Sequence, residues 1–357
     1  MNRVYFKNFG IYHQHAKNSA ELSALVSSRI PLSAEEQDPY QTISQEIINK
    51  NLVSREDRAV LNSQSKMVLN ALSDLGERLD LASLSESTLY SACDSEEHNL
   101  SILREVINRD PVSFWQNISD IKKLSNPLEM LRLLPTNPLY HVSKVLKNHS
   151  EGVPLRSASL SGLSALKIAC ADIAYGSAKA GAIIMNSANM HSLDSLVMFN
   201  KFGEIKQRDS QQSGIIPSWG GVVVHLDHTP DNALAEVLAV TMHYQPLPKF
   251  EKQPWFALFD AANNSHGAPD VIISYENGIV SQSKAEREAL HDVFPNVQLI
   301  NYKSLIGYGG KVNNLVDIVC ALSDSRIKPG SKVLFNGAGI MHGLGCALLR
   351  ISGEAKP

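Results

Sequence analysis

The sequence lacks the features that define several large classes of protein. Its four cysteines include no Cys-x-x-Cys pair, and three of them lie in apolar runs, so they predict small buried side chains and no metal site or disulfide framework. Charged residues make up 19% of the chain and leave a net charge of −3, which gives no basic surface for nucleic acid. No apolar run reaches about 18 residues, and residues 1–16 lack the apolar core of a signal peptide. We therefore expect a cytoplasmic protein with no membrane span.

What the chain does have is an alternation of strand and helix patterns. With 43% hydrophobic residues it can bury a large core. Its second half predicts short strands buried on both faces, separated by helices, which is typical of a layered α/β sheet. Residues 14–60 are polar and predict mainly loop, with a possible helix at Asp38–Ile48. The strands expected after residue 220 are Val222–Leu226, Ala235–Tyr244, Val271–Tyr275, Val297–Ile300, Lys332–Asn336 and Cys346–Ile351.

The most informative stretch lies near the middle of the chain. Pro154–Leu160 predicts a short strand, a turn of small residues follows, and Leu163–Tyr175 predicts a helix that is apolar on most of its surface. Gly176 stands where a helix ends in a left-handed residue, and Ala182–Met185 predicts a second buried strand. A strand, a sharp turn and a buried helix form an elbow that projects one side chain into the interior. Here that side chain is Ser159.

This stretch, SASLSGLSALKIACADIAYGSA, resembles the nucleophile elbow of the β-ketoacyl synthases, the condensing enzymes of the thiolase fold. In that family the nucleophile is a cysteine, and Ser159 occupies its position here. The resemblance implies an α/β protein with two similar halves in a five-layered α-β-α-β-α arrangement. The halves would be residues 1–228 and 229–357.

The other catalytic motifs of the family are altered in this chain. The resemblance places Asn277 at the first catalytic histidine and Tyr308 at the second, within the stretch that begins at Lys303-Ser304. Lys303 is retained, and Glu288, eleven residues after Asn277, coincides with the family's supporting glutamate. Asparagine can donate a hydrogen bond but carries no titratable proton at neutral pH, and tyrosine, with a reference pKa near 10, is a poor proton shuttle there.

The C-terminal loop of the family is altered too. Its phenylalanine gates the acyl pocket, but here Ala338 stands at that position and is too small for the role. Ile340 replaces a glycine and would restrict the movement of the loop. The six residues that correspond to the gating loop are Gly337, Ala338, Gly339, Ile340, Met341 and His342.

The resemblance thus implies a ketosynthase fold that has lost condensation, because serine without a base is a very weak nucleophile. Members of the family of this kind are chain-length factors, which pair as heterodimers with an active β-ketoacyl-ACP synthase and help to shape the tunnel that holds the growing chain. Such a subunit meets the acyl carrier protein only through the complex, needs no cofactor or metal, and is not expected to be an enzyme on its own. The eroded motifs are similar to those of the chain-length-factor-like subunit of aryl polyene systems. The residues implied at the partner interface are Pro154, Leu155, Arg156, Ser157, Ala158 and Leu160.

Other functions remain open from the sequence. Ser159 could serve an acyltransferase or thioesterase if His342 or His266 were its base, although both histidines are more typical of loop or surface positions. An atypical active condensing enzyme is a further alternative, with Asn277 and Tyr308 forming an oxyanion hole. A structural homodimer with no acyl role is the third.

Overall fold

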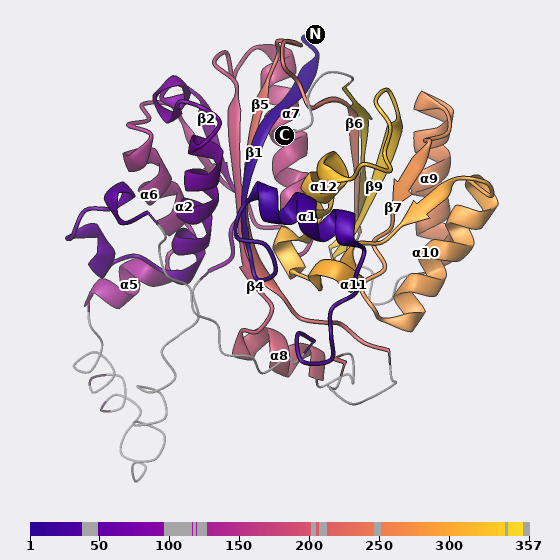
Figure 1. Ribbon diagram of the computed structural model, residues 1–357, viewed down its shortest axis with the longest axis horizontal. Coiled ribbons are helices and arrows are strands. Elements are labelled where there is room, and N and C mark those ends of the chain that lie inside the picture. The colour runs from indigo at the N-terminus through magenta and orange to yellow at the C-terminus, as the bar shows by residue number, and fades with distance from the viewer. Residues whose placement is uncertain are drawn as a thin grey trace.

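The computed structural model describes residues 1–37, 49–95, 116, 119, 127–200, 205–206, 213–245, 251–339 and 342–352, and the expected helix at Asp38–Ile48 lies outside these ranges. The described strands form one ten-stranded mixed sheet flanked by helices (Figure 1), which confirms the α/β class. The strands are β1 Val4–His13, β2 Thr88–Ser91, β3 Gly152–Pro154, β4 Ala182–Asn189, β5 Trp219–Asp227, β6 Ala235–Tyr244, β7 Val271–Ile273, β8 Gln298–Ile300, β9 Lys332–Gly339 and β10 Gly343–Ile351.

Helices cover both faces of this sheet, and short 3₁₀ turns join several of the elements. The α-helices are α1 Ser19–Ser28, α2 Ser63–Gly76, α5 Pro127–Leu133, α6 Asn137–Val145, α7 Ser161–Tyr175, α8 Leu193–Asn200, α9 Lys252–His266, α10 Val280–Val293, α11 Lys303–Ile306 and α12 Asn313–Ser323. The 3₁₀ turns are η1 Lys50–Leu52, η2 Asp57–Ala59, η3 Leu81–Leu84 and η4 Gly310–Val312. Among the described helices, none combines the length and the apolar character that a membrane crossing requires.

The sheet is built from two equivalent halves. Its order is β3-β2-β4-β5-β1-β6-β10-β9-β7-β8, so reading outward from the centre gives the same pattern on both sides. Pairing directions match as well: β1–β5 and β6–β10 are antiparallel, whereas β2–β4 and β7–β9 are parallel. Antiparallel pairing of β1 with β6 joins the halves. The division at residues 228 and 229 stays a prediction, because the halves share this sheet and one core.

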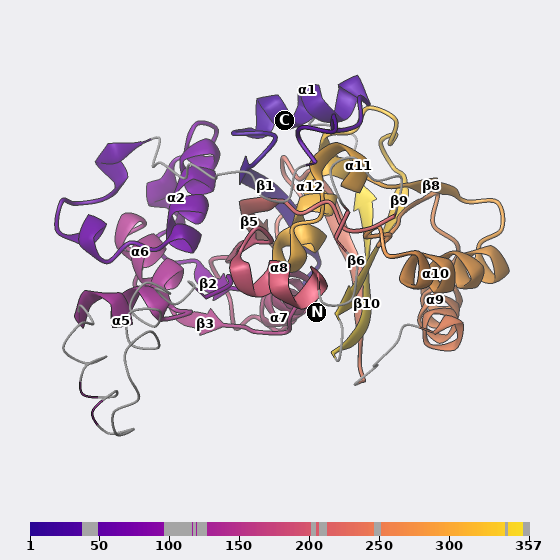
Figure 2. The same cartoon turned by 90° about the horizontal axis from the view of Figure 1, so that it is seen from below.

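Side-chain alternation along the strands sorts the core into layers. On β4, Ala182 and Ile184 belong to the central hydrophobic cluster that contains α7 and α12. Ile183 and Met185, which point to the opposite face, belong to a separate cluster with α2 and α6. Helices therefore cover both faces of the first half-sheet, as the two views in Figures 1 and 2 show.

The second half-sheet is arranged in the same way. Val333 and Phe335 of β9 face the central cluster, while Leu334 and Ala338 face the cluster of α9 and α10. Because α7 and α12 lie between the half-sheets, the order of layers is α2/α6, sheet, α7/α12, sheet, α9/α10 (Figure 2). This is the five-layered arrangement that the resemblance implied.

One expectation about the N-terminal region is wrong. Residues 14–60 were expected to be mainly loop, yet α1 spans Ser19–Ser28. Asn18 caps this helix by accepting a hydrogen bond from the Glu21 backbone, and Glu21 accepts one from the Lys17 backbone. The buried carboxylate of Asp74 in α2 also accepts bonds from the Ser19 backbone and side chain, which fixes the start of α1 against α2.

Candidate functional site

The elbow differs from its expected form. Strand β3 ends at Pro154, so the prediction of a strand over Pro154–Leu160 is wrong, and α7 begins at Ser161. Between them, Ala158 adopts φ 48°, a left-handed conformation that non-glycine residues rarely take. The Ser161 hydroxyl donates to the Ala158 carbonyl at 2.7 Å and accepts from the Ser157 backbone at 2.9 Å, which locks the turn.

The far end of the elbow helix is as expected. Gly176 caps α7 with φ 82°, and its backbone amide donates to carbonyls of the last turn. The turn that precedes α7 therefore holds Ser159 at the inner end of a helix that is packed between the two half-sheets.

The structure brings Ser159 and Tyr308 together. The Tyr308 hydroxyl donates to Ser159 Oγ at 3.0 Å, and this is the hydrogen-bond partner of Ser159 within the described residues. Tyr308 is 1% exposed, and its burial raises the pKa of its hydroxyl above the ordinary value. It is therefore a neutral donor at physiological pH.

Two more polar side chains continue this contact away from Ser159. Tyr275 Oη lies 3.2 Å from Tyr308 Oη, and Asn277 Nδ2 donates to Tyr275 Oη at 3.0 Å. Asn277 Nδ2 also donates to Gln282 Oε1 at 3.0 Å. Asn277 Oδ1 accepts from the Ile279 backbone at 3.0 Å, which fixes the orientation of the amide.

The two ends of this series of hydrogen bonds determine which hydroxyl donates between the two tyrosines. Asn277 can only donate to Tyr275, and Tyr308 donates to Ser159, so the proton between the two tyrosines belongs to Tyr275. The sequence predicted positions 159, 277 and 308 as one site, and they do lie in one hydrogen-bonded chain. Tyr275, which completes the chain, was not predicted as a site residue; its only sequence signal is its place two residues before Asn277.

Lys303, five residues before Tyr308, is also buried. It is 5% exposed, and its ammonium donates to Asp317 Oδ2 at 2.6 Å and to the Ser274 carbonyl at 2.7 Å. The pKa of Asp317 is raised by burial, an effect that Lys303 opposes. The pair joins α11 to α12 and to the strand end that carries Tyr275.

The expected supporting carboxylate, Glu288, is in the wrong place for that role. Its side chain is 48% exposed and pairs with Lys284 at 3.8 Å on the outer face of α10. Glu286 is the fully buried carboxylate of that helix, and it accepts from the Tyr275 and Glu276 backbones at 2.7 and 3.0 Å. It also accepts from Asn336 Nδ2 at 2.8 Å, so Glu286 fixes the turn that carries Tyr275 and Asn277.

The glycines of the expected gating loop lie beside the elbow helix. A Cβ at Gly337 would lie 2.7 Å from Leu163 and 2.6 Å from Asn314, and one at Gly339 would lie 3.3 Å from Leu160. Ala338 is fully buried among the residues of α9 and α10. Ile340 and Met341 lie outside the described residues.

Neither histidine considered as a base hydrogen-bonds to Ser159 in the described structure. His342 is exposed in the turn between β9 and β10, and His266 is the exposed last residue of α9 in an outer layer. A serine nucleophile needs a base within hydrogen-bond reach. The contacts of Ser159 supply only a tyrosine donor.

Strand β3 is one edge of the sheet. The carbonyl of Glu151, just before β3, and the amide of Leu155, just after it, bond to β2, so the backbone polar groups of Gly152 and Pro154 point away from the sheet. Pro154 and Arg156 are exposed, whereas Leu160 is fully buried in the central core. The partner interface over Pro154–Leu160 stays a prediction.

The equivalent half-sheets, the helices buried between them and the elbow define the thiolase-like fold of the ketosynthases. No protein-family model matches the sequence, and no curated protein is similar to it in sequence. Among solved structures, the chain is similar to AntDE:AntF, a type II PKS acyl-carrier protein in complex with its ketosynthase bound to the hexaketide. The TM-score is 0.75 at 14% identity, covering 99% of this chain and 100% of that chain.

Two further structures are described as pairing a ketosynthase with a chain length factor. The ishigamide ketosynthase/chain length factor gives a TM-score of 0.75 at 14% identity, covering 98% of this chain and 100% of that chain. The PfaC keto synthase-chain length factor gives 0.76 at 13% identity, covering all of this chain but only 43% of that one. At these identities the likeness shows the fold.

Glu286 predicts a dependence of stability on pH. Burial raises its pKa from 4.5 to about 7, so the folded protein holds this proton more tightly than the unfolded chain. Its contribution is fully present below about pH 4.5 and is lost as pH rises to about 7, a change of roughly 3 kcal/mol. Measured by denaturant unfolding across this pH range, the free energy of unfolding should fall less steeply with pH for Glu286→Gln than for the wild type. Glu288→Gln is the control, and equal slopes in wild type and Glu286→Gln would contradict the assignment.

The tyrosine pair predicts an energetic coupling. Tyr308→Phe should lower the free energy of unfolding by about 1–3 kcal/mol, because buried hydroxyls lose a partner. The double variant with Tyr275→Phe should cost at least about 0.5 kcal/mol less than the sum of the single changes. Tyr175, which is 72% exposed, provides the control Tyr175→Phe, with an expected effect within about 0.5 kcal/mol. Additive effects of the two buried changes would argue against a continuous chain.

Proposed function

We propose that this chain is a non-catalytic ketosynthase-like subunit, a chain-length factor, that pairs with an active β-ketoacyl-ACP synthase. In the complex it would help to shape the tunnel for the growing acyl chain. The observation that carries this proposal is the closed hydrogen-bond chain from Asn277 to Ser159, in which the groups at the catalytic positions are already committed to one another.

Condensation needs a nucleophilic thiolate and two donors that are free to hold an enolate oxygen. Both N–H groups of Asn277 are used, one on Tyr275 and one on Gln282. The hydroxyl proton of Tyr308 is used on Ser159. An incoming carbonyl would have to break one of these buried bonds before it gained another, so the site offers little net stabilisation.

The nucleophile position leads to the same conclusion. A serine hydroxyl has a much higher pKa than a cysteine thiol and needs an adjacent base. Ser159 Oγ instead accepts a hydrogen bond from Tyr308, whose hydroxyl is kept neutral by burial. This favours the partner role over the Ser159-dependent acyltransferase or thioesterase and over an atypical condensing enzyme.

The edge of the sheet supports a partner subunit. The Gly152 amide and the carbonyls of Gly152 and Pro154 point outward on β3. Such groups can pair with an edge strand of a second protein, which would extend the sheet through the dimer. Pro154 has no amide proton, so the donors available to the partner along this edge come from Gly152 and Arg156.

The similar structures indicate the class of pathway. Two of them are described as ketosynthase/chain length factor structures, and a third as a ketosynthase with its type II PKS acyl-carrier protein. By analogy we assign this chain to type II fatty acid or polyketide-type synthesis in the cytoplasm, with a carrier protein reached through the complex. A polyene product, of the aryl polyene kind, is the chain type that we propose.

Replacing Ser159 by alanine separates the partner role from the enzyme role. In a reaction reconstituted with the active ketosynthase and its carrier protein, Ser159→Ala should change product yield by less than about twofold. A thermal unfolding curve for the variant controls for the lost bond to Tyr308. Near-total loss of product from a folded Ser159→Ala protein would show that Ser159 is catalytic.

Gly152 tests the edge strand. Gly152→Pro removes the outward amide donor while the bonds from Glu151 and Leu155 to β2 remain, so affinity for the ketosynthase should fall at least about tenfold. Gly152→Ala keeps the donor, and its added Cβ meets only the flexible end of Leu139, so it is the matched control. Equal affinities of Gly152→Pro and Gly152→Ala for the ketosynthase, measured by calorimetry, would show that the ketosynthase binds at another surface.

A further inference from the structure

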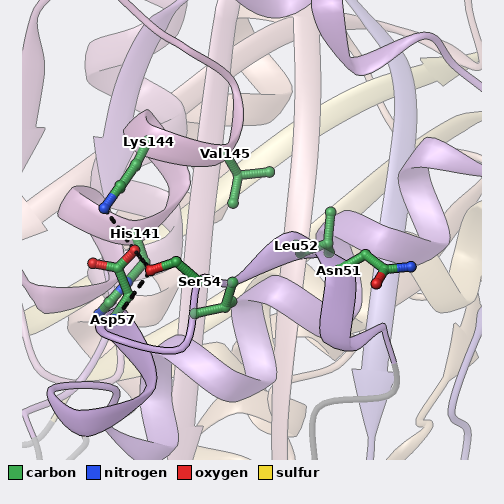
Figure 3. A pocket seen from close by; sticks show the side chains of 8 residues that line it. Asn51, Leu52, Ser54, Asp57, His141, Lys144 and Val145 are labelled. Atoms are coloured by element: carbon green, nitrogen blue, oxygen red, sulfur yellow. Dashed lines mark hydrogen bonds and ion pairs between the residues drawn. The ribbon is translucent and has the colours of Figure 1, made fainter.

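The pocket drawn in Figure 3 lies between η1, η2 and α6, and its charged and hydroxyl groups already satisfy one another. Ser54 Oγ and Lys144 Nζ both donate to Asp57 Oδ2 at 2.6 Å. The Nε2 atom of His141 has no partner among the described residues, but it is sealed from solvent, so a ligand cannot reach it. This pocket therefore leaves no accessible group for a ligand to satisfy.

A pocket of about 290 Å³ beside α10 is different. It lies where the parallel strands β7 and β8 end, between the turn at residues 276–278, the start of α11 and residues 213–216. Ligands of α/β proteins often bind outside the carboxyl ends of parallel strands. Asn277 borders both this pocket and the site at the elbow, but neither Ser159 nor Tyr308 lines the pocket, so it is a separate opening.

The first turn of α10 brings unpaired donors to this pocket. Ile279, the residue before the helix, has no side-chain acceptor, so α10 lacks a side-chain cap. The amides of Val280, Ser281 and Gln282 have no hydrogen-bond partner among the described residues. These amides lie next to the pocket, because Gly278 and Val280 line it. The start of a helix favours a bound anion, which accepts such hydrogen bonds.

Ser283 adds a buried hydroxyl to these amides. It is 3% exposed, and its hydroxyl has no hydrogen-bond partner among the described residues, yet its oxygen is not sealed from solvent. Val280, Ser283 and Arg287 all line the pocket, and their spacing of three and four residues puts them on one face of α10. The Ser283 side chain therefore faces the pocket. A buried hydroxyl without a partner costs free energy that a bound acceptor would recover.

Arg287 brings a guanidinium group back to the start of the helix. Its Nε lies 2.7 Å from Glu276 Oε1, so the side chain runs along α10 toward the residues that precede the helix. Because Ser283 is four residues before Arg287, this path passes beside the Ser283 hydroxyl. The two terminal nitrogens of the guanidinium have no hydrogen-bond partner among the described residues, and the side chain is 60% exposed. Two N–H groups in a planar fork thus remain for a ligand.

We propose that this pocket binds a phosphate group, either free phosphate or a phosphate monoester. Its oxygens would accept from the first-turn amides of α10, the Ser283 hydroxyl and the Arg287 guanidinium. Apart from Glu276, which holds Arg287, the charged and buried groups that face the pocket are donors, and a phosphate group places several acceptor oxygens on one centre. The site does not depend on the partner role.

The test compares two substitutions that remove the same charge from α10. The full chain, labelled with ¹⁵N, is titrated with inorganic phosphate at constant ionic strength, and the Ser283 amide resonance should shift saturably. Arg287→Gln should weaken the affinity at least about tenfold. Lys284 does not line the pocket, its side chain is 72% exposed, and it pairs with Glu288, so Lys284→Gln should change the affinity less than about twofold.

A second pair of variants isolates the hydroxyl. Ser283→Ala should weaken phosphate binding about three- to tenfold, because one hydrogen bond is lost. Ser281 is exposed and its side chain is outside the pocket, so Ser281→Ala, which keeps the backbone amide, is the control. Potassium chloride at the same ionic strength should leave the Ser283 amide resonance unmoved, and this comparison on the unmodified protein decides the question if a variant does not fold.

Propyl phosphate distinguishes the two sources of the phosphate group. Tighter binding than inorganic phosphate would support a monoester, whose carbons contact the apolar side chains of Ile216 and Val280, and equal or weaker binding would support free phosphate. Three results would overturn the proposal: no saturable shift with either phosphate, equal loss of affinity in Arg287→Gln and Lys284→Gln, or unchanged affinity in folded Ser283→Ala.

Discussion

The hydrogen bond from Tyr308 to Ser159 is the contact on which the functional account depends. It joins the elbow before α7 to the segment before α12, and so it links the two halves of the molecule at their centre. Through Tyr275 and Asn277 it continues to the turn that Glu286 holds from α10. The groups that the resemblance places at the catalytic positions of a condensing enzyme are parts of one polar network here. Such a network rigidifies a site but leaves no donor for a substrate.

The internal duplication explains why this contact lies where it does. α7 and α12 occupy equivalent places in the two halves, each between a short edge-side strand and a long central one, and both are buried in the layer between the half-sheets. Their N-terminal turns meet at the pseudo-symmetric centre of the fold. The edge strand that we propose as the partner-facing surface, β3, comes directly before this elbow in the chain.

Local pattern and motif spacing predicted much of this from the sequence. The apolar helix before Gly176 and strand β6 follow from residue patterns that have a single good structural interpretation. The grouping of Ser159, Asn277 and Tyr308 came instead from the resemblance to the ketosynthase motifs. What failed depended on tertiary contacts. Glu288 and Glu286 lie two residues apart, about 200° around a helix, so a motif spacing carried over by family resemblance selected the exposed carboxylate. The strand expected to reach Leu160 ends at Pro154, because Ser161 draws the backbone into a locked turn.

The central claim is that Ser159 carries no acyl group. The most direct test is intact-protein mass spectrometry of the purified chain after incubation with acyl-carrier-protein thioesters, alone and together with the active ketosynthase. The account predicts an unchanged mass for this chain in both cases and acylation of the partner's cysteine only. An acyl adduct that maps to Ser159 and disappears on turnover would contradict it.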